Sequence, residues 1–160
     1  MRCRSAATAA LLVAACSTGD GLEPLQARVR TPDQRATIDV DGCGRDGDVI
    51  VLGASSSSVL VQLLLVLDGD EVDLDASGLT VTLGDRGTLG AGDAEVIQAE
   101  RPAGAITSAN VRGDRIEVVA DAEPVTPGAD LDAGEVRVVA RCTADEELAA
   151  PVLDADLTQP

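Results

Sequence analysis

The sequence predicts an all-β fold, an antiparallel β-sandwich of about seven to eight short strands with one disulfide. Apolar and polar residues alternate with a period of two in several segments, and Gly/Asp-rich turns separate these segments. No segment has the convincing 3.6-residue apolar period of an amphipathic helix. This combination is typical of strands that place one face on a core and the other in water. We expect the sandwich to occupy residues 35–143.

The period of two begins at Arg35, where Ala36, Ile38 and Val40 alternate with polar residues. Cys43 has the wrong parity for this inward face, so a bend or β-bulge at Asp41-Gly42 is needed to turn its thiol toward the core. The next segment, 48–53, is apolar on both faces and is typical of a central strand.

The most apolar segment after the first sixteen residues is Val59–Leu67. Its length fits a strand and its leucines fit a helix, and periodicity alone does not separate the two. Asp68-Gly69 follows directly and is a hairpin signal, with an alternating segment, 71–75, after it. We therefore predict a strand.

The second half of the chain repeats this pattern. A turn-rich loop is expected at 84–92, and a loop containing Pro124, Pro127 and Gly128 before the last strand. Further strands are predicted at 79–83, 94–99, 105–111, 115–122 and 135–142. In the last of these, Val136, Val138, Ala140 and Cys142 share one face, which predicts that Cys142 points into the core.

The N-terminal segment has the parts of an export signal. Two arginines lie within Met1–Arg4, a short apolar run follows, and Leu12-Val13-Ala14-Ala15-Cys16 fits a lipobox. We interpret 1–15 as a cleaved lipoprotein signal peptide and Cys16 as the lipidation site, which carries membrane-anchoring acyl chains. A plain secretory signal with an incidental Cys16 is the alternative.

The flanks of the predicted domain are polar. Residues 16–34 lack a sustained period and contain glycines and prolines, so they are expected to be a lipid-anchored, flexible linker. Residues 144–160 are expected to form an acidic C-terminal tail, with a short helix possible at 144–150. The protein would then be exported and anchored to the outer face of the cell membrane or within the cell envelope.

Cysteine usage agrees with export. Cys3 leaves with the signal and Cys16 is consumed by lipid, so Cys43 and Cys142 remain as an even pair. A disulfide closing a loop of about 100 residues stabilises by roughly 4–5 kcal/mol on the chain-entropy account. The alternative is a metal site, but the sequence has no histidine and only these two thiols for it.

Composition excludes several functions. The formal net charge is −16, and loss of Arg2 and Arg4 with the signal makes it −18, which repels nucleic acid. Without His, Lys or Tyr, serines such as Ser56, Ser77 and Ser108 lack the usual catalytic bases. Paired carboxylates lack an aromatic platform for a sugar. We therefore expect neither an enzyme nor a cofactor.

Two acidic clusters offer oxygen ligands of the kind calcium prefers. They are Asp39/Asp41/Asp46/Asp48 and Asp68/Asp70/Asp73/Asp75. Neither follows the calcium-loop motif, because Val72 occupies a ligand position and Asp73 occupies the position that requires glycine. We interpret these acids as a solvated strand edge and predict no metal site.

The chain resembles the LpqH-type actinobacterial (mycobacterial) lipoprotein antigens. The resemblance runs from the signal and Cys16 through Ile38-Asp39 ahead of Cys43, the segments 47–53, 67–69 and 113–118, and 135–138 before Cys142. It implies a lipidated envelope protein with one disulfide, no known catalytic residues, and a cell-surface role that includes recognition by host lipopeptide receptors. The chain departs from the family in its acidic, arginine-only charge, in lacking aromatic residues, and in a linker poor in Ser and Thr.

Two functions remain open. The first is a non-catalytic surface or interaction lipoprotein of the cell envelope, held in the membrane by acyl chains on Cys16 and contacting envelope or host proteins. The second is a carrier of an apolar, lipid-like ligand, with Val59–Leu67 lining a cavity between the sheets.

Overall fold

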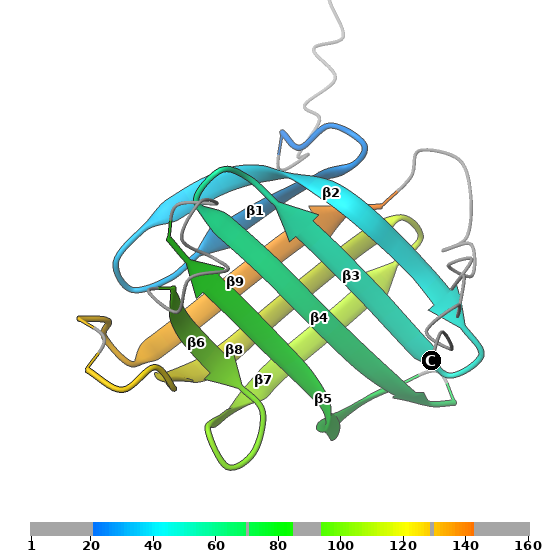
Figure 1. Cartoon of the computed structure of the whole chain (residues 1–160). Helices are drawn as coiled ribbons and strands as arrows, with labels where there is room; N and C mark the ends of the chain where they lie inside the picture. Colours follow the sequence, from blue (N-terminus) through cyan, green and yellow to red (C-terminus); the bar gives the residue numbers. More distant parts are fainter. Residues whose placement is uncertain (1–20, 70, 85–93, 129, 143–160) are drawn as a thin grey trace, which may run out of the picture.

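A computed structural model describes residues 21–69, 71–84, 94–128 and 130–142. These residues form nine antiparallel strands (Figure 1). The strands are β1 (Gln26–Arg30), β2 (Arg35–Asp46), β3 (Val49–Ser55), β4 (Val59–Asp68), β5 (Glu71–Leu83), β6 (Glu95–Ala99), β7 (Gly104–Arg112), β8 (Arg115–Pro124) and β9 (Gly134–Arg141).

The strands form one sheet that closes on itself. Their order is β6-β5-β4-β3-β2-β1-β9-β8-β7, and β6 also pairs with β8. Ile97 and Gln98 of β6 lie opposite Pro124 and Glu123 at the end of β8, which closes a ring of eight strands. The ninth strand, β7, pairs with the rest of β8 on the same side as β6. β6 and β7 therefore share one position in the wall.

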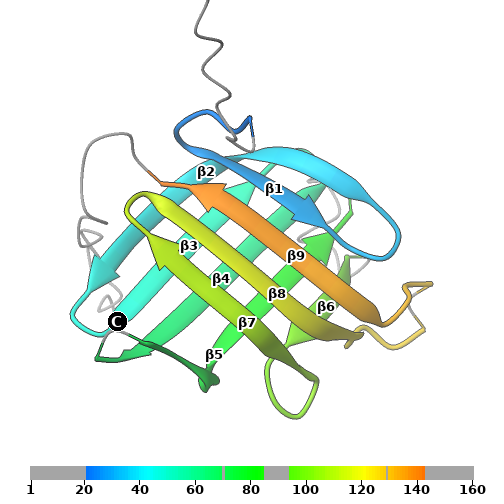
Figure 2. The same cartoon turned by 180° about the vertical axis from the view of Figure 1, so that it is seen from behind.

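The predicted β-sandwich is wrong, because the strands close into an eight-strand barrel. A period of two separates inward from outward residues but does not say whether the last strand pairs back to the first. The barrel is flattened: β2–β5 form one wall, and β1, β9, β8 and β7 form the wall behind it, with strands that cross those in front (Figures 1 and 2). Inward-facing residues of such walls alternate just as those of two stacked sheets do.

Inward-facing aliphatic side chains fill the barrel. An eight-strand barrel is just wide enough for its interior to be filled by side chains, so branched residues and alanines suffice without any aromatic ring. The largest fully buried side chains are Ile50, Leu52, Leu63, Leu65, Leu79, Ile97, Ile116, Val59, Val61, Val81, Val118 and Val136.

Several local predictions are confirmed. The β2–β3 register shifts between Val40 and Gly42, and this bulge gives Cys43 the inward parity shared with its partner Leu52. Residues 59–68 form a strand, and Asp68 pairs with Glu71 across the predicted hairpin. Val136, Val138, Ala140 and Cys142 are all fully buried, as their shared parity predicts.

Two boundaries differ from the prediction. β1 lies inside the range 16–34 that we expected to be a linker; Ala27 and Val29 are buried there while their neighbours face out. Prolines on both sides and a length of five residues hide this strand in the sequence. In addition, 71–75 and 79–83 belong to one strand, β5, rather than two. The segments predicted as signal peptide (1–15) and acidic tail (144–160), and most of the predicted loop at 84–92, lie outside the described residues.

Gly104 is the first residue of β7, at the point where β7 takes over from β6 as the neighbour of β8. Its φ is +87°, and a Cβ there would collide with the carbonyl oxygen of Asp121 on β8. The backbone of Gln98 is also close, with its carbonyl oxygen 3.0 Å from that Cβ position. Only glycine fits where three backbone segments meet and the barrel closes.

We predict that Gly104→Ala destabilises the fold by about 2–4 kcal/mol, because strain at a positive φ adds to a backbone collision. Gly113→Ala is the matched control: its φ is +56° but nothing lies within 4 Å of the added Cβ. It should cost only about 1–2 kcal/mol. Urea unfolding measures both variants, and equal losses would contradict the role given to Gly104.

Candidate functional site

The disulfide joins β2 and β9 beyond the point where β1, the strand between them, begins. Cys43 and Cys142 are bonded, with their Cα atoms 5.5 Å apart. β1 separates β2 from β9 but begins only at Gln26, which pairs with Asp39 and Arg141. Past that point β2 and β9 converge to the Cα separation of directly paired strands. The covalent bond therefore replaces a missing part of the ladder at this end of the barrel, which we call the mouth.

A second gap lies at the same mouth, between β5 and β7. β5 pairs with β6 only through Leu79–Leu83, and β7 pairs with β8 on its other side. No ladder between β5 and β7 is present in the described residues. The barrel wall is therefore hydrogen-bonded around one end and has a seam at the other.

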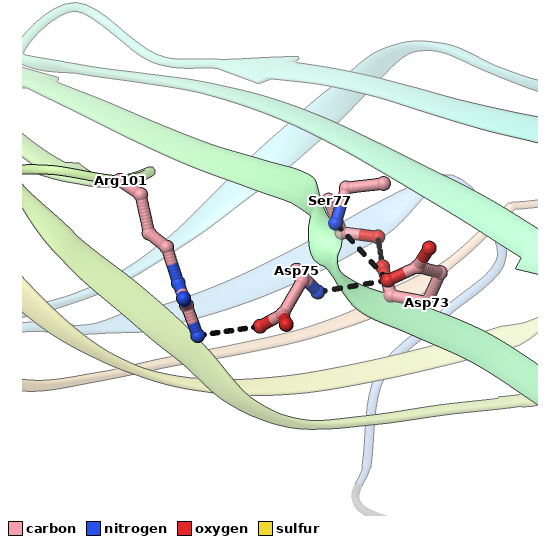
Figure 3. Close-up of polar contacts among 5 residues, drawn as sticks. Asp73, Asp75, Ser77 and Arg101 are labelled. Carbon is pink, nitrogen blue, oxygen red and sulfur yellow. Dashed lines mark hydrogen bonds and ion pairs between the residues drawn. The ribbon is translucent and has the colours of Figure 1, made fainter.

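A wide bulge in β5, in its ladder with β4, lies beside this seam (Figure 3). The β4–β5 register jumps from Leu64–Gly78 to Val66–Asp73, so residues 74–77 have no partner on β4. Ser77, which is buried, occupies the gap: its hydroxyl accepts from the Val66 N–H (2.9 Å) and donates to the Asp73 carbonyl (2.6 Å). One side chain thus bonds two backbone groups of the residue pair at which the register shifts.

The Asp73 side chain holds the turn of the bulge. Its Oδ1 accepts from the backbone N–H groups of Asp75 (3.0 Å) and Ala76 (3.2 Å). On the far side of the turn, the Arg101 guanidinium donates to Asp75 at 2.6 Å and so links β5 to the β6–β7 connection (Figure 3). Both side chains of this ion pair are exposed, so the link contributes about 0–1 kcal/mol.

The mouth contains a cavity of about 620 Å³ beside the seam. Apolar side chains from four strands line it: Ile50, Leu67, Val72, Leu74, Ala109 and Val111. Polar groups lie among them and at the rim: Arg45, Gly69, Glu71, Thr107, Ser108 and Asn110. The volume is within the range of about 300–1,000 Å³ that is typical of small-molecule pockets, which often lie in the mouths of β-barrels.

Arg45 is the cation of this cavity. The residue pairs with Ile50 across β2 and β3, so its side chain leaves β2 on the inward face. Its Nε donates to the Gly47 carbonyl at 2.9 Å, which fixes the guanidinium at the β2–β3 turn. Within the described part of the chain, no carboxylate lies at ion-pair distance from it, whereas Arg101, Arg137 and Arg141 each pair with an acid.

A separate charged cluster lies on the outer face of β8 and β9. Arg137 hydrogen-bonds to Glu117, and Arg115 lies 3.5 Å from the same carboxylate. The hydrogen bond from Arg137, helped by the charges of both arginines, holds the pKa of Glu117 below its ordinary value of 4.5 against an opposing effect of burial. Arg141 pairs with Asp114 at 2.6 Å and reaches the Leu22 carbonyl, which fastens the chain before β1.

The structure brings only some of the sequence-predicted residues together. Cys43 and Cys142 meet, while Cys16 lies outside the described residues. Ser56 accepts from the Val59 N–H at a turn, and Ser77 holds the β5 bulge. Among the described acids, no group of three is close enough to bind a metal ion.

The segment Val59–Leu67, suggested as the lining of a ligand cavity, contributes to the mouth cavity only at its end. Val59, Val61, Leu63 and Leu65 are buried in the filled barrel, and the alternate residues face outward, with Leu64 43% exposed. Leu67 alone of this segment lines the mouth cavity. The sequence did not predict Arg45 as a site residue. In the sequence it is one more polar residue of a strand, and the bulge in β2 is what gives it the inward parity.

No protein-family model, curated protein or solved structure matches the chain. In the part of the chain that the structure describes, no helix has the length and apolar character needed to cross a bilayer. The proposed function therefore rests on the sequence and on the geometry of the described residues.

Ser77→Ala should destabilise the fold by about 1–3 kcal/mol, because it leaves the Val66 N–H without its acceptor. Ser108→Ala, an exposed serine at the same seam, should change stability by less than about 0.5 kcal/mol. Urea unfolding of the two variants tests this. If both behave alike, the Ser77 hydroxyl does not hold the bulge.

Glu117→Gln should make the free energy of unfolding decrease less as the pH is lowered. Because the folded pKa of Glu117 is lowered, its contribution is present above pH 4.5 and is lost as pH falls through the lowered value. At pH 7 the variant should lose less than about 1 kcal/mol, since the cluster is on the surface. Unfolding at pH 7 and pH 3.5 measures the difference, and an unchanged acid slope would count against this ion pair.

Proposed function

We propose that this protein is a lipid-anchored cell-envelope lipoprotein of the LpqH type that acts as a non-catalytic surface or interaction protein. Acyl chains on Cys16 would hold it at the outer face of the membrane, and the barrel domain would project toward envelope or host protein partners. The lipobox Leu12–Cys16 is the observation that carries the proposal.

The disulfide supports export. Cys43–Cys142 is a long-range bond, with a sequence separation of 99, and such bonds persist in oxidising compartments outside the cytosol. Charge supports anchoring by lipid, because a mature chain of net charge −18 would be repelled by an anionic membrane surface. The chemistry of the described surface also agrees: the three candidate serines hold turns or line the seam and have no histidine or lysine beside them.

A second candidate function is a carrier of an apolar, lipid-like ligand. The mouth cavity is the observation that favours it, because this open pocket of about 620 Å³ combines six aliphatic side chains with polar groups that could hold a headgroup. The cavity lies beside the seam, where β5 and β7 are not joined by a β-ladder in the described residues. This candidate is compatible with lipid anchoring and adds a ligand to it.

Cys16→Ser tests the anchoring proposal. Expressed with its own signal in a bacterium that lipidates exported proteins, the variant should move from the membrane fraction to the soluble fraction, because the acyl attachment atom is gone. Ser17→Ala is the control and should remain with the membrane. Intact mass should show acyl chains on the parent protein only. A Cys16→Ser chain that still sediments with membranes would refute the proposal.

A further inference from the structure

We propose that the mouth cavity binds a single-chain anionic amphiphile, with its acidic head on Arg45 and its aliphatic chain against the apolar lining of β3–β5 and β7. This inference rests on the carrier candidate and deepens it by assigning the headgroup charge. The ligand class is a long-chain carboxylate or phosphate monoester, which share one oxyanion head and one alkyl chain.

The guanidinium of Arg45 is arranged to accept an oxyanion. Its Nε is already used by the Gly47 carbonyl, so the group is oriented while both Nη atoms keep their donors. Two parallel N–H donors match the geometry of a carboxylate or phosphate. No described carboxylate occupies that position, although the mature chain has a large excess of acids. Pairing would therefore not displace an existing ion pair within the described residues.

The surroundings of Arg45 select an amphiphile over a simple anion. Its register partner Ile50 lines the cavity, and Leu67, Val72 and Leu74 continue the apolar surface toward the seam. Ile50 is already buried, but Leu67, Val72 and Leu74 are partly exposed; a small hydrophilic anion would leave them in water, whereas an alkyl chain would cover them. The volume of about 620 Å³ suits one chain rather than a two-chain lipid.

Among the described lining residues, Glu71 carries a negative charge that would repel the acidic head of the ligand. Glu71 also lines the cavity and is exposed. Removing its charge should therefore strengthen binding of an anion and leave binding of a neutral chain unchanged. Loss of the Arg45 charge should weaken binding of an anion and loss of the Glu71 charge should strengthen it. These opposite effects distinguish an effect of charge from a general change of the pocket.

The test compares an acid with its uncharged counterpart on the Cys16→Ser full chain, which has no acyl chains to compete. The probes are 11-(dansylamino)undecanoic acid and its primary amide, measured by fluorescence titration. The acid should bind about tenfold more tightly than the amide, and Arg45→Gln should remove that preference, since a charge-assisted hydrogen bond has about this effect. Glu71→Gln should tighten binding of the acid alone. Arg30→Gln, at the opposite end of the barrel, should change neither.

Three outcomes would overturn the inference. If acid and amide bind equally and Arg45→Gln changes nothing, the carrier candidate stands and the headgroup assignment fails. If neither probe binds, both fail. If neither probe binds but anionic phosphatidylglycerol vesicles do, the oxyanions belong to a membrane surface and not to a single-chain ligand. Melting temperatures equal to that of the parent establish that each variant is folded.

Discussion

The bond between Cys43 and Cys142 is the constraint on which the mouth of the barrel depends. β1 is five residues long and ends its ladders at Gln26, yet β2 continues for seven residues beyond Asp39, its last partner on β1. Without the bond, the end of β2 would be joined to the wall through β3 alone. With it, β2 and β9 are held at a paired-strand distance, and Arg45, two residues after Cys43, is held over the cavity.

The two ends of the barrel are built differently. At one end, β6 pairs with both β5 and β8, and Gly104 allows three backbones to meet closely. At the other end, covalent and side-chain groups replace backbone pairing: the disulfide spans β2 and β9, and Ser77 fills the β5 bulge. The mouth cavity lies where the β5 ladders are incomplete, and there a ligand or partner would find apolar side chains that the wall does not fully cover.

Sequence reasoning predicted most of the strands and the disulfide but not the closure. Alternation located β2, β8 and β9, the Asp68-Gly69 hairpin signal identified β4 as a strand, and the parity mismatch at Cys43 required the bulge that the structure contains. Barrel closure depends on two residue pairs between β6 and β8, and nothing in the pattern of either strand encodes its partner. β1 was hidden between prolines, and the mouth cavity arises from gaps in pairing, which periodicity does not report.

The acidic charge of the chain gives its few arginines particular weight. A chain of formal net charge −16 repels anions in general, and Arg45 at the mouth, with no described carboxylate at ion-pair distance, offers an anion a local exception to that repulsion. Structural arginines elsewhere in the described residues hold the wall: Arg141 fastens the start of β1 and Arg137 joins β9 to β8.

Amide hydrogen exchange of the oxidised and reduced protein tests whether the Cys43–Cys142 bond holds the mouth of the barrel together. The account predicts that reduction speeds exchange of the β2 and β3 amides near the mouth, from Gly42 to Ile50, by at least about tenfold. The amides of β6 and β8 around the closure at Ile97 and Glu123 should keep their protection. Uniformly faster exchange throughout the barrel, or no change at Gly42–Ile50, would contradict the view that this bond holds the mouth where β1 does not reach.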